Sequence, residues 1–132
     1  MGSGRRVAIT GIGLCTPIGD SLDEVSEAMR TDVSGVRVQD RWAAIGHLAT
    51  RLGGECGEVR LAGCDRKKVR SMGRVARLAL KATERALADA QIADVGDPRI
   101  GLAYGSTHGS SSAYVAFARP LFARDSFEVL PS

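Results

Sequence analysis

The side chains best suited to nucleophilic or metal chemistry in this sequence are three cysteines, Cys15, Cys56 and Cys64, and two histidines, His47 and His108. An odd number of cysteines without a Cys-x-x-Cys pair argues against a disulfide scaffold and favours reduced thiols in a cytoplasmic protein. A structural zinc ion needs about four ligands at short, paired spacings, and these five residues form no such pairs. We therefore expect no metal site.

A nucleophilic cysteine needs a lowered pKa, which a helix N-terminus, a cationic neighbour or a histidine partner provides. Cys15 lies in an apolar segment with no such group near it in the sequence, and we interpret it as a buried, inert thiol. Cys64 precedes a basic segment that would lower its pKa modestly. Neither cysteine has an adjacent histidine, so the sequence identifies no activated thiol.

The segment Thr10-Gly-Ile-Gly13 follows a short apolar run and resembles the glycine turn of dinucleotide-binding folds. Those patterns place a further glycine at position 15 or 16, where this chain has Cys15 and Thr16. That last glycine lets the helix begin against the pyrophosphate, but here the next helix signal comes only at Ser21. The spacing favours a second interpretation, in which the glycines allow tight packing where a strand leaves the core.

A basic cluster, Arg66, Lys67, Lys68, Arg70 and Arg74, forms the most charged part of the chain. Such a cluster is either a docking surface for an acidic partner or a solvated helix face, and the sequence leaves both open. Nucleic acid is disfavoured as the partner, because no aromatic residues alternate with the charges to stack on bases.

Hydrophobic periodicity predicts alternating strands and helices. The expected elements are a buried strand within Arg6–Leu14, a helix from Ser21 that fades at Thr31, an exposed strand within Thr50–Cys56, a long helix over Ser71–Gln91, a strand over Arg99–Ala103 and a helix over Ser110–Ala123. This order indicates an α/β fold with a mostly parallel sheet flanked by helices. Two or three strands are few for a self-sufficient sheet, so we expect the domain to be incomplete.

Local signals refine these elements. Ser21 and Glu24 have the spacing of a capping box, and Trp42, the only tryptophan, is expected to anchor the irregular stretch Val36–Ile45. Pro120 is expected to kink or end the last helix.

The composition is that of an ordinary globular protein. The chain has 132 residues, of which 44% are hydrophobic and 25% charged, and these values argue against disorder. Its formal net charge of +3 permits an acidic partner without requiring one. No run approaches the ~20 apolar residues of a membrane span, so we expect no membrane association.

Three segments together resemble the N-terminal part of a β-ketoacyl synthase of the elongating kind. They are Arg6–Gly19, Asp65–Arg74 and Ile100–Gly109, and the resemblance extends from about Arg5 to Ser132. It implies a thiolase-like fold of two similar α/β halves and a decarboxylative condensation of acyl and malonyl thioesters. In that family a cysteine at a helix N-terminus and two later histidines carry the chemistry.

The resemblance implies that the catalytic residues are absent from this chain, because neither Cys15 nor Cys64 stands in the Thr-Ala-Cys-Ala-like setting of the family's nucleophile. We expect residues 1–4 to be a flexible leader and residues 5–132 to be the N-terminal part of the synthase domain, ending before the nucleophile segment. The isolated chain is then expected to be inactive.

The resemblance also implies sites and partners. The residues expected to dock acyl carrier protein are Lys67, Lys68, Arg70 and Arg74, with Lys67 and Arg70 as the best matches and Ser71 replacing a position that is often basic. His108 is expected either at the edge of the acyl pocket or as a solvated loop histidine. The expected partners are acyl carrier protein, acyl and malonyl thioesters and a second copy of the chain, with no cofactor.

Two other functions stay open at this point. One is a non-catalytic module of synthase descent that binds the carrier protein or serves as a pairing module. The other is a nucleotide-dependent oxidoreductase, which the misplaced glycines disfavour.

Overall fold

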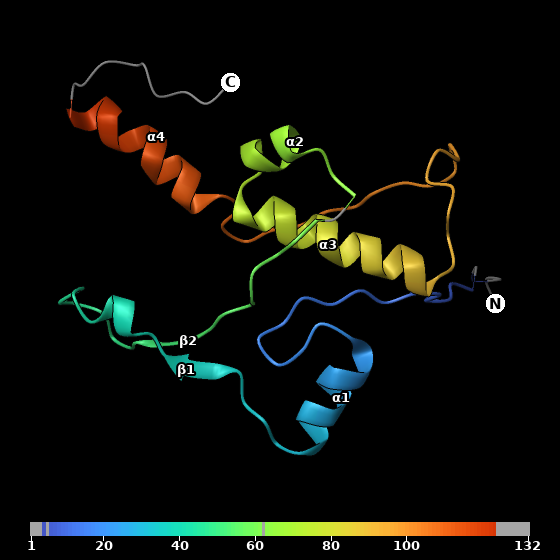
Figure 1. Cartoon of the computed structure of the whole chain (residues 1–132), viewed down its shortest axis with the longest axis horizontal. Helices are drawn as coiled ribbons and strands as arrows, with labels where there is room; N and C mark the ends of the chain where they lie inside the picture. Colours follow the sequence, from blue (N-terminus) through green and yellow to red (C-terminus); the bar gives the residue numbers. More distant parts are fainter. Residues whose placement is uncertain (1–3, 5, 62, 124–132) are drawn as a thin grey trace. The chain divides into compact units, whose positions relative to one another are not determined.

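The computed structural model describes residues 4, 6–61 and 63–123 (Figure 1). Most of the expected leader, residues 1–3, and the end of the chain from residue 124 lie outside the described residues. The elements in chain order are α1 (Leu22–Arg30), β1 (Val36–Val38), η1 (Asp40–Trp42), β2 (Leu52–Gly54), α2 (Arg66–Ser71), α3 (Arg74–Asp89) and α4 (Ser111–Ala123).

The chain divides into two compact units. The first comprises Met1–Glu58 with Ala82–Ala93, and the second comprises Val59–Lys81 with Asp94–Ser132. The N-terminal half of α3 therefore belongs to the second unit and its C-terminal half to the first.

In the first unit, α1 begins where the sequence predicts. The Ser21 hydroxyl accepts a hydrogen bond from the Glu24 amide, and the Glu24 carboxylate accepts one from the Ser21 amide, so the capping box is confirmed. Ala28 of this helix is 8% exposed and is the only buried apolar residue among the described residues, whereas Leu22 and Met29 are exposed. The helix ends at Thr31, as expected.

The predicted exposed strand within Thr50–Cys56 is confirmed as β2, which pairs antiparallel with β1, where Val36 faces Gly54 and Val38 faces Leu52. The stretch Val36–Ile45 is therefore more regular than expected. A Cβ added at Gly53 would lie 2.7 Å from Cη2 of Trp42, so the indole lies directly over the backbone of β2. Trp42 thus anchors this pair of strands, as predicted.

The glycine turn also belongs to the first unit, where it lies against the C-terminal half of α3 (Figure 1). A Cβ added at Gly11 would lie 2.3 Å from the Ala86 carbonyl oxygen, and one at Gly13 would lie 1.9 Å from that of Ala82. Only a residue without a side chain allows this approach. The packing interpretation of the two glycines is confirmed.

In the second unit, the predicted helix Ser71–Gln91 is wrong at its start. The helix α2 ends at Ser71, Met72 is extended with φ −81° and ψ 127°, and α3 begins at Arg74. A Cβ added at Gly73 would lie 2.6 Å from the Ser110 hydroxyl oxygen, so the Ser110 side chain lies against the Gly73 backbone at the break. The apolar period continues through the break, which is why periodicity alone does not reveal it.

The predicted last helix is confirmed as α4, but Pro120 does not end it. The helix continues to Ala123 with Pro120 inside it. Several of its large apolar side chains are exposed, among them Tyr114 at 70% and Phe122 at 81%.

The two predicted core strands do not form within the described residues. Residues 7–10 and 100–103 carry no strand assignment, and Val7 and Leu102 are 92% and 79% exposed. A strand exists only through hydrogen bonds to a neighbouring strand, and β1–β2 is the only sheet of the described part. The expected parallel sheet is thus not formed within the described residues.

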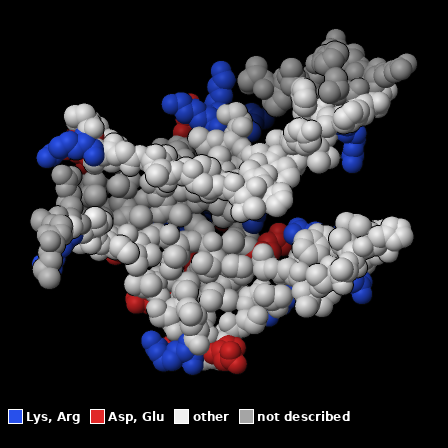
Figure 2. Space-filling model, turned by 180° about the vertical axis from the view of Figure 1, so that it is seen from behind, with Lys and Arg blue, Asp and Glu red and all other residues white. Residues whose placement is uncertain are grey.

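On the face drawn in Figure 2, charged side chains form small separate groups on a largely uncharged surface.

No helix in the described part of the chain has the length and apolar character needed to cross a membrane.

Candidate functional site

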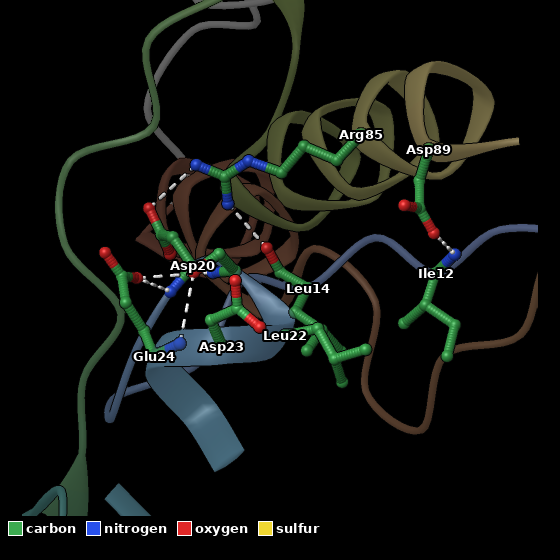
Figure 3. Close-up of a pocket in the computed structure, with 9 residues that line it drawn as sticks. Ile12, Leu14, Asp20, Leu22, Asp23, Glu24, Arg85 and Asp89 are labelled. Carbon is green, nitrogen blue, oxygen red and sulfur yellow. Dashed lines mark hydrogen bonds and ion pairs between the residues drawn. The ribbon is translucent and has the colours of Figure 1, made fainter. Parts of the chain in front are cut away.

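A hollow in the first unit lies between the segment after the glycines, the start of α1 and the C-terminal half of α3 (Figure 3). Its volume is about 560 Å³, and the residues that line it are Ile12, Leu14, Asp20, Ser21, Leu22, Asp23, Glu24, Arg85 and Asp89. The polar side chains come from two regions far apart in the sequence, residues 20–24 and α3.

Arg85 joins α3 to the segment before α1. Its Nη2 donates to the Asp20 carboxylate at 2.9 Å, and its Nη1 donates to the Leu14 carbonyl (Figure 3). The hydrogen bond that Arg85 donates to Asp20 is also an ion pair, and it holds the pKa of Arg85 above its ordinary value. The Arg85 side chain is 29% exposed, so water screens this pair less than it screens a pair on the open surface.

Two carboxylates of the hollow are held by backbone amides. Asp89 accepts a hydrogen bond from the Ile12 amide at 2.9 Å, and Glu24 accepts from the Asp20 amide at 2.8 Å and the Ser21 amide at 3.2 Å. These backbone hydrogen bonds lower the pKa of Glu24. Asp89, Glu24 and Arg85 are thus occupied in holding the segment Ile12–Ser21 in place, and the geometry supports a structural role for the hollow.

Cys15 has a cationic neighbour that the sequence did not reveal. Arg85 Nη1 donates to the Cys15 sulfur at 3.4 Å, across 70 residues of sequence. Burial nevertheless raises the pKa of the Cys15 thiol, and this effect exceeds the opposing effect of Arg85. The raised pKa supports the interpretation of the half-buried Cys15 as an inert thiol, which stays a prediction, and the surroundings of Cys15 are more polar than the sequence suggested.

Arg85 is the main residue of this site that sequence reasoning missed. It lies off the apolar stripe of its helix, four residues before Asp89, so that both side chains project from the same face. The four-residue spacing of Arg85 and Asp89 could have indicated a shared polar face, but it does not reveal which segment that face contacts.

The basic cluster lies in the second unit, mainly on α2. The Asp65 side chain caps this helix by accepting a hydrogen bond from the Lys67 amide at 2.8 Å. The side chains of Lys67, Lys68 and Arg70 are exposed, and within the described part of the chain no ion pair engages them. Arg74 is exposed at the first position of α3, beyond the break at Met72. The predicted docking residues are therefore accessible, and their role stays a prediction.

His108 lies in the loop before α4 and is exposed. The Gly109 amide donates to the Ser106 hydroxyl at 3.0 Å, the Ser111 hydroxyl donates to the His108 carbonyl at 3.2 Å, and Gly109 has φ +48°. These bonds fix the backbone of the loop and leave the imidazole in solvent. A place for His108 at the edge of an acyl pocket stays a prediction.

Metal ligation has no visible basis in the described ranges, where no group of three or more His, Cys, Asp or Glu side chains is arranged to hold an ion.

The comparisons with known proteins agree with one another. The family model described as the beta-ketoacyl synthase N-terminal domain matches residues 4–128. The crystal structure of a beta-ketoacyl synthase from Burkholderia phymatum STM815 is similar, with a TM-score of 0.79 and 39% sequence identity over 92% of this chain. The chain spans 31% of the length of that synthase. A search among curated proteins found no match.

Proposed function

Because the chain belongs to the beta-ketoacyl synthase family, we propose that it is the N-terminal part of a 3-oxoacyl-acyl-carrier-protein synthase and that α2 docks the carrier protein. Such an enzyme transfers an acyl group to a cysteine and joins it to a malonyl unit with loss of carbon dioxide. The proposal includes acyl and malonyl thioesters as substrates and a homodimer as the working form.

The observation that supports docking most directly is the accessibility of the cations on α2. Lys67, Lys68 and Arg70 project from a six-residue helix that contains no acidic residue. Cations that are not already paired can attract an acidic protein over about a Debye length and can pair with its carboxylates. A solvated helix face would have the same composition, so binding is the property to measure.

The proposal assigns the nucleophilic thiol and the two histidines of the reaction to residues other than those of this chain. The raised pKa of Cys15 supports this assignment, because less thiolate is present at neutral pH. The chain then supplies scaffold and docking surface. We expect no malonyl-dependent condensation from the isolated chain, and clear turnover would contradict this assignment.

Reversing two charges on α2 tests the docking. The variant Lys67→Glu with Arg70→Glu should weaken binding of acyl carrier protein about tenfold at low ionic strength, because two favourable ion pairs become repulsive. The measurement is the Kd by titration at low and high salt, and the difference between the proteins should shrink as salt screens the charges.

The matched control is Arg37→Glu with Arg51→Glu, which changes net charge equally at two exposed arginines outside the basic cluster. This control should bind nearly as tightly as the parent chain. If both double variants weakened binding equally, the attraction would depend on net charge and not on α2. If the parent chain did not bind acyl carrier protein at low salt, the docking proposal would be contradicted.

A further inference from the structure

Two segments of the first unit run side by side in opposite directions, and each carries a cysteine. A Cβ added at Gly54 would lie 2.9 Å from Cγ of Pro17, and the Cys56 thiol donates to the Cys15 carbonyl oxygen at 3.2 Å. Pro17 lies two residues after Cys15, and Gly54 lies two residues before Cys56. The two contacts together define an antiparallel alignment in which Cys15 faces Cys56.

The Cys56 sulfur lies 3.2 Å from the carbonyl oxygen of Cys15 itself, so the two cysteines are immediate neighbours across the two segments. A disulfide requires Cβ atoms about 3.5–4.5 Å apart, a separation that neighbouring residues can reach when their side chains turn toward each other. All three cysteines of the structure are thiols, and Cys15 and Cys56 are half-buried rather than enclosed. A disulfide reagent can therefore reach this pair.

We propose that Cys15 and Cys56 form a dithiol that a small-molecule disulfide converts to an intramolecular disulfide. This inference does not depend on the proposed function, since neither thiol has a role in it.

The exchange balances with oxidised glutathione as the oxidant. The Cys56 thiolate attacks one sulfur of oxidised glutathione, and the glutathione S–S bond breaks and releases one glutathione thiolate. The Cys15 sulfur, after losing its proton, attacks the Cys56 sulfur of the mixed disulfide and releases the second glutathione thiolate. The two released thiolates take up the two protons from the cysteines, so two thiols are oxidised and one disulfide is reduced.

Burial and electrostatics give this order of attack. The raised pKa of Cys15 makes it the poorer first nucleophile, whereas its contact with Arg85 stabilises the thiolate once it forms. Cys15 therefore acts second, when its target sulfur is already held opposite it.

The lengths of the two possible disulfide loops predict which bond an unfolded chain would form. Cys15 and Cys56 are 41 residues apart, whereas Cys56 and Cys64 are only 8 apart. In an unfolded chain the shorter loop closes about tenfold more often. A preference for the longer loop is therefore a property of the fold.

The test is oxidation of the whole chain with oxidised glutathione, followed by tryptic mapping without reduction. Cleavage after Arg30, Arg51 and Arg60 puts the three cysteines on three different peptides, so each possible bond has its own mass. We expect the native chain to join Cys15 to Cys56 and to retain one alkylatable thiol, Cys64. In urea the main product should change to Cys56–Cys64.

Three single variants test the preference for the Cys15–Cys56 bond, so that the test does not depend on the folding of any one variant. Cys64→Ser should form the bond as readily as the parent chain. Cys15→Ser should instead keep a glutathione on Cys56, and Cys56→Ser should acquire one on Cys15 several-fold more slowly. A native product that contains Cys64, or separate glutathione adducts on Cys15 and Cys56 in the parent chain, would overturn the proposal.

Discussion

Two glycine-containing segments of this chain look alike in sequence but differ in structure. Gly11 and Gly13 follow the apolar run Val7–Thr10, and Gly105 follows the apolar run Ile100–Ala103. A Cβ at either of the first two would collide with the backbone of α3, whereas a Cβ at Gly105 would meet nothing within 4 Å. The first segment uses its glycines for contact, and the second does not within the described structure.

The difference arises from what each segment faces. Ala82, Ala86 and Ala90 repeat at a spacing of four residues, so they form a stripe of small side chains on one side of α3. A glycine backbone can approach such a stripe closely, and Arg85 and Asp89 then bind the same segment from α3. The loop containing Gly105 has only local bonds, such as that between Gly109 and Ser106.

The largest effect should come from filling the close contact. In Gly13→Ala the new methyl group would lie 1.9 Å from the Ala82 carbonyl oxygen and 2.6 Å from the Ala86 amide nitrogen, so the helix and the segment must separate. We expect the free energy of unfolding to fall by about 1–3 kcal/mol. Urea denaturation followed by far-ultraviolet circular dichroism measures this change.

The matched substitution in the second segment is Gly105→Ala. It meets no atom within 4 Å and should change stability by less than about 0.5 kcal/mol, or raise it slightly by restricting the unfolded chain. If the free energy of unfolding fell by the same amount in both alanine variants, the proposed difference between the two segments would be contradicted.

A smaller effect is expected from Arg85→Met, which keeps the length of the side chain and removes its bonds to Asp20 and Leu14. We expect the free energy of unfolding to fall by about 1–2 kcal/mol. The loss is limited because Asp20 is 56% exposed, so water partly replaces the lost bonds. Thermal unfolding of the variant checks the value.

The control is Arg99→Met, which breaks the local ion pair with Asp97 in the second unit. The Arg99 side chain is 87% exposed, so its loss should be close to neutral. If Arg99→Met lost more stability than Arg85→Met, the exposed local ion pair would contribute more than the ion pair of Arg85 with Asp20, contrary to this expectation.

The smallest effect is a dependence on pH. The pKa of Glu24 is lowered by the amides of Asp20 and Ser21, so its stabilising contribution is complete above its unfolded value of about 4.5 and is lost as the pH falls through the lower folded pKa. Glu24→Gln should therefore be less stable than the parent above about pH 4.5 and should approach it in acid. Unfolding midpoints between pH 3 and pH 7, roughly the range over which carboxylates titrate, measure this difference.

Asp97 provides the comparison in the second unit. Arg99 lowers its pKa by hydrogen bonding, in the same direction as for Glu24. The partner is only two residues away, so the pair can also form in the unfolded chain, and Asp97→Asn should alter the acid dependence less than Glu24→Gln. An equal change in both variants would mean that the Glu24 bonds also persist after unfolding.

Local signals predicted local structure well. The capping box at Ser21 depends on residues three apart in sequence and is present. The strand around Leu52 and the packing of Trp42 join segments that are farther apart but follow each other along the chain, and both are present. The family match extends over residues 4–128, so the resemblance drawn from three short segments was sufficient to recognise the family.

The remaining features depend on distant contacts that the sequence does not encode locally. The Ser110 side chain lies against Gly73 beside the break at Met72, and the contacts of Arg85 depend on the segment that its helix meets. Extended apolar runs such as residues 7–10 predict a strand correctly only where a neighbouring strand is available to pair with them.

The position of the only tryptophan determines which part of the molecule fluorescence can report. The Trp42 indole lies over Gly53, with the Arg41 guanidinium 5.9 Å from the ring centroid, so its emission responds to solvent entry at β1 and β2. An unfolding curve from emission and one from circular dichroism, which is dominated by the helices, therefore observe different elements. Coincident curves would identify a cooperative transition that includes both, and separated curves would give the order in which they are lost.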